Sequence, residues 1–458
     1  MSRRALRWLY REVHYIGKQH IPVSGPVLLL GNHPNDLPDV LAGLFTTERH
    51  VRYVATLSAT VLPLATASYK AMRVIPVMRV RDVRKLRARG VDVGAVNAAA
   101  FEAVREAFVA DDVVAIFPEG GVHDKPKLGS LRSGVSKMAL IGLDTASKNP
   151  LTVVPFGMHY EAPRTHRSDL IVEIGEPFSL ADWYAQTQQP SERSAEPALT
   201  ARLYGAIFAV TRNSSSWGHA DARDQLIATI AALVGTDEEP LLTTTTRVRA
   251  HCAALVESDA HAPSRAGEPW QTVANPIGDA VVRAGGLRTS ARDTARLLDA
   301  AALPTSQPSW RPEGASAVHV HAHWPSITAI LITAVPALIG LLLHAPLWLG
   351  VLRVAKRLTL VRTDYVAKAI LPGLHLILLG YLVLGGLCAL AARAAGWSMW
   401  WALALLVVLP SLGDLGLWWR DAVRAVRLRA RVRGWSAADR TAVVHTAERI
   451  HAAWNALS

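Results

Sequence analysis

Hydrophobic residues in the first half of the chain fall into short runs that are separated by longer, alanine-rich stretches. The short runs are rich in Val and Ile and cover residues 27–30, 51–55, 74–77, 113–116, 151–156 and 170–174. The stretches with helical composition or spacing cover residues 96–109, 203–210 and 226–234. Short apolar runs that alternate with helices are typical of a sheet covered by helices. The pattern predicts an α/β domain over residues 1–235, in which helices flank a central mixed sheet.

Residues 236–323 contain fewer apolar runs than the segments on either side. A helix-like stretch at 289–302 is followed by a Pro- and Ser-rich stretch at 304–314, which is typical of a connector. We therefore predict a mobile, partly helical linker. Three histidines alternate at its end, between residues 319 and 323, and could gather a metal ion. A solvated linker explains them better, and we predict no metal site.

Three long apolar runs follow, at residues 324–352, 369–392 and 397–419. The first two contain no Asp, Glu, Lys or Arg, and the third contains only Asp414. Each run is long enough to cross a bilayer, which takes roughly 20 apolar residues. The third run has tryptophans at both ends, as in the aromatic belt of a membrane protein. These tryptophans are Trp397, Trp400, Trp401, Trp418 and Trp419. We predict that residues 324–419 form membrane segments followed, over residues 420–458, by a basic cytoplasmic tail.

The charges beside the apolar runs suggest how the chain crosses the membrane. Residues 353–368 and 420–433 are both basic, and basic flanks favour the cytoplasmic side. Both can lie there if the second and third runs form a hairpin and the first run enters and leaves on one side. Pro336, His344 and Pro346 permit such a path. We predict a re-entrant first segment followed by a helical hairpin.

Charge and hydropathy narrow the choice of partners. The chain has 458 residues, 50% of them hydrophobic, a mean hydropathy of +0.20 and a net charge of +12. This charge suits an acidic membrane surface, a phosphorylated ligand or a nucleic acid. Because the C-terminal arginines follow an apolar run, we interpret them as lipid-facing charge. We expect a phospholipid membrane as a partner and no nucleic acid.

The two cysteines and the N-terminus indicate a reducing compartment. Cys252 and Cys388 are too few and too differently placed for a disulfide framework or a cysteine-ligated zinc site. Residues 1–11 are basic and have no apolar core like that of a signal peptide. We expect the catalytic domain to face the cytoplasm at the cytoplasmic membrane.

Two polar clusters directly follow apolar runs, one at residues 32–39 and one at residues 117–120. In α/β sheets, ligand sites lie at the carboxyl ends of strands. His33 is the candidate general base, because an imidazole beside a carboxylate can accept a proton from a hydroxyl near neutral pH. Asp36 and Asp39 both remain candidates for that carboxylate. Asp39 also has a structural explanation, since an acidic residue in the first turn favours a helix.

Four segments together resemble the sequence blocks of the glycerol-3-phosphate and lysophosphatidate acyltransferase family. They are Asn32-His33 with Asp39, Arg73 to Arg79, Phe117 to Gly120, and Val153 to Gly157. The resemblance spans residues 10–235. Five residues stand between His33 and Asp39, whereas the usual first block has four. The longer spacing looks like that of a branch acting on glycerol 3-phosphate or dihydroxyacetone phosphate.

The resemblance implies direct acyl transfer in the synthesis of phospholipids. His33 would deprotonate the acceptor hydroxyl, which attacks the thioester of the acyl donor, while Asp39 orients the imidazole and no acyl-enzyme forms. Arg79 would hold the acceptor phosphate. The full set of implied substrate-binding residues is Asn32, Arg73, Arg79, Glu119, Gly120, His123 and Pro155. No cofactor is implied beyond the co-substrate, an acyl-coenzyme A or acyl carrier protein thioester, and no metal.

Two other function classes fit parts of the pattern. A metal-dependent phosphoesterase could use the imidazole and carboxylate groups of His33, Asp36, Asp39 and His123. A non-catalytic membrane-binding protein could keep the same fold. The sequence does not choose between glycerol 3-phosphate, dihydroxyacetone phosphate, a lysophosphatidate or another lysophospholipid as acceptor.

Overall fold

The chain forms two compact units in the computed structural model. Unit 1 comprises Met1–Tyr160 and Leu170–Asn213, and unit 2 comprises Glu161–Asp169 and Ser214–Ser458. The structure describes residues 6, 9–56, 73–78, 92–144, 149–162, 167–187, 191–234, 244–245, 247–249, 269–287, 290–302, 325–358, 365–398 and 400–457.

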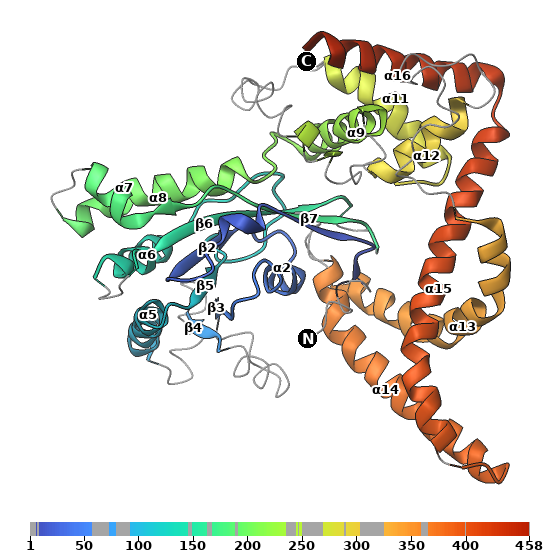
Figure 1. Ribbon diagram of the computed structural model, residues 1–458, viewed down its shortest axis with the longest axis horizontal. Helices are drawn as coiled ribbons and strands as arrows, with labels where there is room; N and C mark the ends of the chain where they lie inside the picture. Colours follow the sequence, from blue (N-terminus) through green and yellow to red (C-terminus); the bar gives the residue numbers. More distant parts are fainter. Residues whose placement is uncertain are drawn as a thin grey trace. The chain divides into compact units, whose positions relative to one another are not determined.

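Unit 1 is built on an eight-stranded mixed sheet, as the sequence predicts (Figure 1). Its strands are β1 (Val13–Ile16), β2 (Val27–Gly31), β3 (Val51–Thr56), β4 (Ile75–Val77), β5 (Val113–Ile116), β6 (Thr152–Tyr160), β7 (Leu170–Ile174) and β8 (Phe178–Ser179). The strand order is β1-β7-β6-β2-β5-β3-β4, and β8 pairs with β6. All six predicted runs are strands. The sequence analysis missed β1, whose residues are all only half-buried, and the two-residue β8.

The centre of the sheet brings the two polar clusters together. Strand β2 lies between β5 and β6 and is parallel to both, with Leu30 opposite Ile116 on one side and Pro155 on the other. Parallel neighbours end at the same edge of a sheet. The loops that follow β2 and β5 therefore leave the sheet side by side.

Helices cover this sheet and bury its central strand. All five residues of β2 are buried, which is typical of a strand covered on both faces. Leu28 and Leu30 share one hydrophobic core with Val104 and Leu203, which come from helices α5 and α8. The helices of unit 1 are α2 (Leu37–Gly43), α5 (Val93–Val109), α6 (Gly134–Asp144), α7 (Leu180–Thr187) and α8 (Glu192–Ala209), with a short 3-10 helix, η1 (Lys18–His20).

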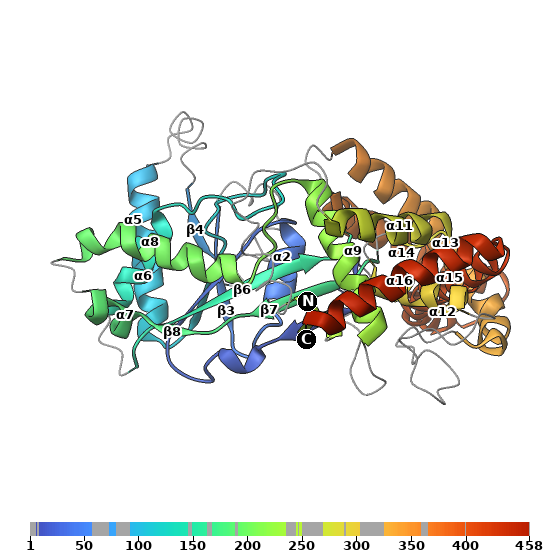
Figure 2. The same cartoon turned by 90° about the horizontal axis from the view of Figure 1, so that it is seen from above.

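Unit 2 is helical in its described part, and its boundary differs from the predicted one. Its helices are α9 (Trp217–Val234), α11 (Pro269–Arg283), α12 (Ala291–Ala302), α13 (Ile327–Leu358), α14 (Tyr365–Ala394), α15 (Trp400–Arg433) and α16 (Ala437–Leu457). Helices α9, α11, α12 and α16 lie close to one another (Figure 2). They share a core with α15 that includes Ile227, Ile277, Leu297, Leu428 and Val443.

The boundary between the units lies between residues 213 and 214 rather than near 235, because the apolar side chains of α9 are buried against α11 and α12. The helix-like stretch expected at residues 289–302 of the linker is present as α12, and its leucines and alanines are buried. The basic tail likewise continues α15 and forms α16, which pack in the same core. Residues 303–324, with the three alternating histidines, lie outside the described residues.

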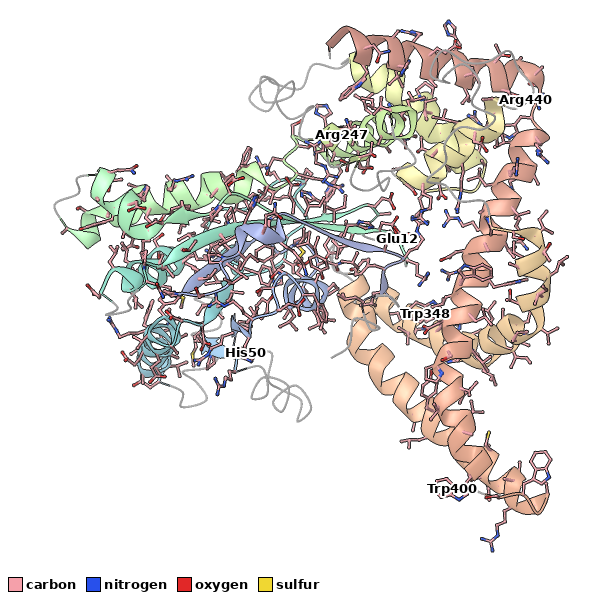
Figure 3. All side chains as sticks on the ribbon, in the orientation of Figure 1. Glu12, His50, Arg247, Trp348, Trp400 and Arg440 are labelled. Carbon is pink, nitrogen blue, oxygen red and sulfur yellow. The ribbon has the colours of Figure 1, made fainter. Side chains whose placement is uncertain are left out.

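Helices α13, α14 and α15 pack against one another and carry exposed apolar side chains. Within the described residues, Ile327–Val351 of α13 is long and apolar enough to cross a membrane, and Leu379–Ala394 of α14 is a shorter apolar helix. Pro336 and Pro346 both lie inside α13. Figure 3 shows Trp400, 77% exposed, at the start of α15. The path of residues 324–419 relative to a bilayer stays a prediction.

Candidate active site

The connection between β2 and α2 presents His33 at the edge of the sheet. Gly31 ends β2 where a Cβ atom would lie 2.3 Å from the ring of Phe156, so no side chain fits there. Asp36 then takes a left-handed backbone conformation, with φ 48°, which lets the chain turn back before α2 begins. Asp39 lies in the first turn of α2, as the sequence predicts. The turn directs its carboxylate toward His33.

The structure distinguishes the two candidate carboxylates by distance. Asp39 Oδ2 lies 2.9 Å from Nδ1 of His33, which is a hydrogen bond. Asp36 Oδ1 lies 3.9 Å from Nε2, and the Asp36 side chain is 50% exposed. A carboxylate on Nδ1 holds the proton there, so the neutral imidazole keeps its free lone pair on Nε2. Nε2 is the atom that can accept a proton from a substrate.

Asp39 is fully buried and accepts three hydrogen bonds. Its Oδ2 also accepts the backbone N–H of Asn35 at 2.7 Å, and its Oδ1 accepts the hydroxyl of Tyr160. Burial raises the pKa of Asp39, whereas the contacts with His33, Tyr160 and Asn35 oppose that rise. These donors stabilise the ionised carboxylate that orients His33.

Glu119 joins the second polar cluster to the first. Its Oε1 accepts the backbone N–H of His33 at 2.9 Å, and its Oε2 accepts the backbone N–H of Gly129 at 2.6 Å and pairs with Nε2 of His123. Although burial works in the opposite direction, these donors lower the pKa of Glu119. The hydrogen bond to Glu119 raises the pKa of His123, against the effect of burial. The buried Glu119 side chain thus fixes two loops around His33, in addition to any contact with a substrate.

An aromatic ring completes the support of His33. The ring of Phe117 is stacked on the imidazole, with ring centroids 4.2 Å apart and an angle of 5° between the planes. Phe117 directly follows β5, which is the parallel neighbour of β2. The sequence analysis used Phe117 as part of a motif but gave it no role.

The remaining predicted site residues lie in different parts of the fold. The Asn32 side chain accepts from the backbone N–H of Met158 at 2.7 Å, so it ties the His33 loop to β6. Pro155 is buried in β6. On the side of β6 that faces away from β2, the strand pairs with β8 before Pro155 and with β7 after it. Gly120 has φ 73°, and Arg73 is exposed just before β4 with φ 49°. Arg79 lies outside the described residues.

A metal site receives no support from the described part of the chain. Within it, no group of three His, Cys, Asp or Glu side chains is arranged to hold a metal ion. The groups that the phosphoesterase alternative requires are instead paired with protein atoms, His33 with Asp39 and His123 with Glu119.

Part of the chain is similar to known acyltransferases. Residues 12–159 match the family model described as Acyltransferase. Over 121 residues the chain is 32% identical to glycerol-3-phosphate O-acyltransferase 2 of Saccharomyces cerevisiae, and over 119 residues it is 36% identical to glycerol-3-phosphate O-acyltransferase 1 of the same yeast. This part of the chain is therefore similar to glycerolipid acyltransferases. Each yeast match covers 26% of this chain and 16% of the relative.

A solved structure of an acyltransferase is also similar to part of the chain. It is the crystal structure of the 1-acyl-sn-glycerophosphate acyltransferase PlsC from Thermotoga maritima, with a TM-score of 0.32 and 16% sequence identity. The similarity covers 44% of this chain and 74% of that chain.

Tyr160 is the residue that the sequence analysis missed. It ends β6, 121 residues after Asp39, and no motif or periodicity links the two positions. A long-range contact of this kind follows only from the pairing of β6 with β2, which brings the end of β6 close to the loop that holds His33.

Proposed function

We propose that this protein transfers a fatty acyl group from an acyl thioester to the hydroxyl of glycerol 3-phosphate or a lysophosphatidate. The observation that carries the proposal is the pairing of His33 Nδ1 with the buried carboxylate of Asp39. This pairing leaves Nε2 as a general base inside a domain that is similar to acyltransferases.

In the proposed reaction, Nε2 of His33 takes the proton of the acceptor hydroxyl as the oxygen attacks the thioester carbonyl carbon. The new C–O bond forms and the C–S bond breaks, so that the sulfur leaves with the electron pair. The departing thiolate then takes up the proton that His33 holds, which returns the base to its neutral form. General-base catalysis of this kind contributes roughly 10²- to 10⁴-fold to the rate.

The phosphate of the acceptor needs a cation, and Arg79 is the residue we propose for it. A guanidinium can bind a phosphate through two parallel hydrogen bonds, which a lysine cannot. Arg79 stands at the end of the sequence block that begins with Arg73, and the family resemblance assigns it this role.

We further propose that helices α13 to α15 hold the enzyme in the cytoplasmic membrane, with unit 1 on the cytoplasmic side. The support is the apolar surface of α13, where Leu331, Ile332 and Leu342 are 69%, 74% and 72% exposed. A surface of this kind is stable in contact with lipid tails rather than water. It also fits a reaction whose product carries an acyl chain.

The experiment uses membranes that contain the full chain, a radiolabelled acyl donor and one acceptor at a time. Acyl-coenzyme A and acyl carrier protein thioesters are each offered with glycerol 3-phosphate, dihydroxyacetone phosphate or a lysophosphatidate, and the products are separated by thin-layer chromatography. We expect a labelled ester with at least one acceptor, formed by the wild type and not by His33→Ala. Equal product from both proteins, or transfer to none of these acceptors, would contradict the proposal.

A further inference from the structure

Two buried tyrosines, Tyr10 and Tyr160, lie close to the carboxylate of Asp39. The side-chain amide of Asn35 donates to the hydroxyl of Tyr10 at 3.1 Å. The hydroxyl of Tyr160, whose side chain lies beside Tyr10, donates to Oδ1 of Asp39. The most exposed of these four residues is Tyr160, at 5%. The rings of the two tyrosines are also in contact, with centroids 5.4 Å apart.

The direction of the hydrogen bond between Tyr160 and Asp39 follows from the chemistry of the carboxylate. An ionised carboxylate only accepts hydrogen bonds, so Tyr160 must donate to Asp39.

The two oxygens of Asp39 accept hydrogen bonds from different elements of unit 1. Oδ2 accepts from Nδ1 of His33 and from the backbone N–H of Asn35, both in the loop before α2. Oδ1 accepts from Tyr160, which belongs to the central sheet. A carboxylate held at both oxygens cannot rotate about its last bond without losing a buried hydrogen bond. Burial and the charge of Asp39 raise the pKa of Tyr160, so the tyrosine keeps the proton that it donates.

We propose that Tyr160 is a positioning residue for acyl transfer, because its hydroxyl holds the carboxylate of Asp39 in the orientation that fixes His33 with Nε2 free. This inference rests on the proposed function. Tyr160 acts through Asp39 and does not itself touch the substrate.

The inference predicts a change in pH dependence. When His33 takes up a proton, Asp39 changes from a lone buried anion to one partner of an ion pair. The hydroxyl of Tyr160 stabilises the lone anion more than the paired one, so its removal favours the protonated, inactive form of His33. The other titratable groups that face this pair in the described part of the chain are Asp36, Glu119, Tyr10 and Tyr53. Tyr160→Phe leaves all four in place.

The experiment compares Tyr160→Phe with Tyr53→Phe in the full chain. Tyr53 is a buried tyrosine of β3 whose hydroxyl has no hydrogen-bond partner among the residues that the structure describes, so it is a matched control for the loss of a buried hydroxyl. For each protein, kcat and the KM values of donor and acceptor are measured from pH 5 to 9. The rate of modification of His33 by diethyl pyrocarbonate is followed over the same pH range by mass spectrometry, since this reagent reacts with the neutral imidazole and requires no turnover.

We expect Tyr160→Phe to lower kcat about 10-fold or more with both KM values nearly unchanged. The acid limb of the kcat profile and the midpoint of His33 modification should both move to higher pH, and Tyr53→Phe should move neither. The inference is overturned if Tyr160→Phe behaves like Tyr53→Phe, or if it loses only folded protein while the midpoint stays in place. If the wild type is inactive or independent of His33, the proposed function fails, and the midpoint of His33 modification alone decides the role of Tyr160.

Discussion

The imidazole of His33 is held from three sides by groups of different kinds. Asp39 accepts its Nδ1 proton, Phe117 stacks on its ring, and Glu119 accepts its backbone N–H. The first contact sets the tautomer, and the second and third set the plane of the ring and the position of the loop. Sequence motifs revealed the identity of these residues, but the stacking and the double use of Glu119 required the packed structure.

The ion pair between Glu119 and His123 gives a pH-dependent prediction at the residue scale. Folding lowers the pKa of Glu119 from 4.5 and raises that of His123 from 6.5. The contribution of Glu119 is therefore present above pH 4.5, and that of His123 is fully present below pH 6.5 and lost as the pH rises through its folded value. We expect His123→Gln to lower the melting temperature by about 2–4 °C near pH 5.5, and by less at pH 9. Thermal melting at the two pH values tests this, and a difference that grows toward pH 9 would contradict it.

At the scale of elements, the strands were predictable because each central strand is a short apolar run buried on both faces. Strand β2 and strand β5 are the clearest cases, and the polar clusters that follow them mark the site. Strand β1 was missed because it is only half-buried. The extent of unit 1 was also missed, because the apolar spacing of α9 does not indicate which unit buries it.

Gly157 in β6 gives a prediction about how α8 meets the sheet. A Cβ atom at Gly157 would lie 1.6 Å from the carbonyl oxygen of Val210, at the end of α8, so the backbone would have to move. We expect Gly157→Ala to destabilise unit 1 by about 1–3 kcal/mol or more. The matched control is Gly205→Ala within α8, where a Cβ atom meets nothing within 4 Å and the substitution should stabilise by about 0.5–1 kcal/mol. Denaturant unfolding compares the two, and a Gly157→Ala protein as stable as the wild type would contradict the close approach.

At the scale of the whole molecule, the long helix α15 has an exposed apolar half and a half that is packed in a core. The first half of α15 exposes apolar side chains such as Val407, 76% exposed, whereas Leu428 in the second half is buried in the helical core of unit 2. An α-helix rises about 1.5 Å per residue, so the 34 residues of α15 span about 50 Å. The sequence indicated that the first half is apolar. The basic half was interpreted as a tail, because only a few apolar side chains among its arginines mark the face that is buried in the core.

The proposed membrane arrangement is tested by labelling single cysteines in intact cells. In a background that carries Cys252→Ser and Cys388→Ala, a cysteine is introduced by Arg357→Cys at the end of α13 or by Arg393→Cys at the end of α14. Basic segments favour the cytoplasmic side, so we expect an impermeant maleimide to label position 393 and not position 357. Labelling of position 357 from outside would contradict the arrangement.

The central claim is that Asp39 contributes to catalysis through His33. The most direct test measures kcat for acyl transfer in the wild type, His33→Ala, Asp39→Asn and the double variant. We predict that His33→Ala lowers kcat roughly 10²- to 10⁴-fold. Asp39→Asn should lower kcat strongly in the wild type and have no further effect in His33→Ala, because residues that act as a unit are not additive. If Asp39→Asn lowers kcat by the same factor in both backgrounds, the two residues act independently and the account is wrong.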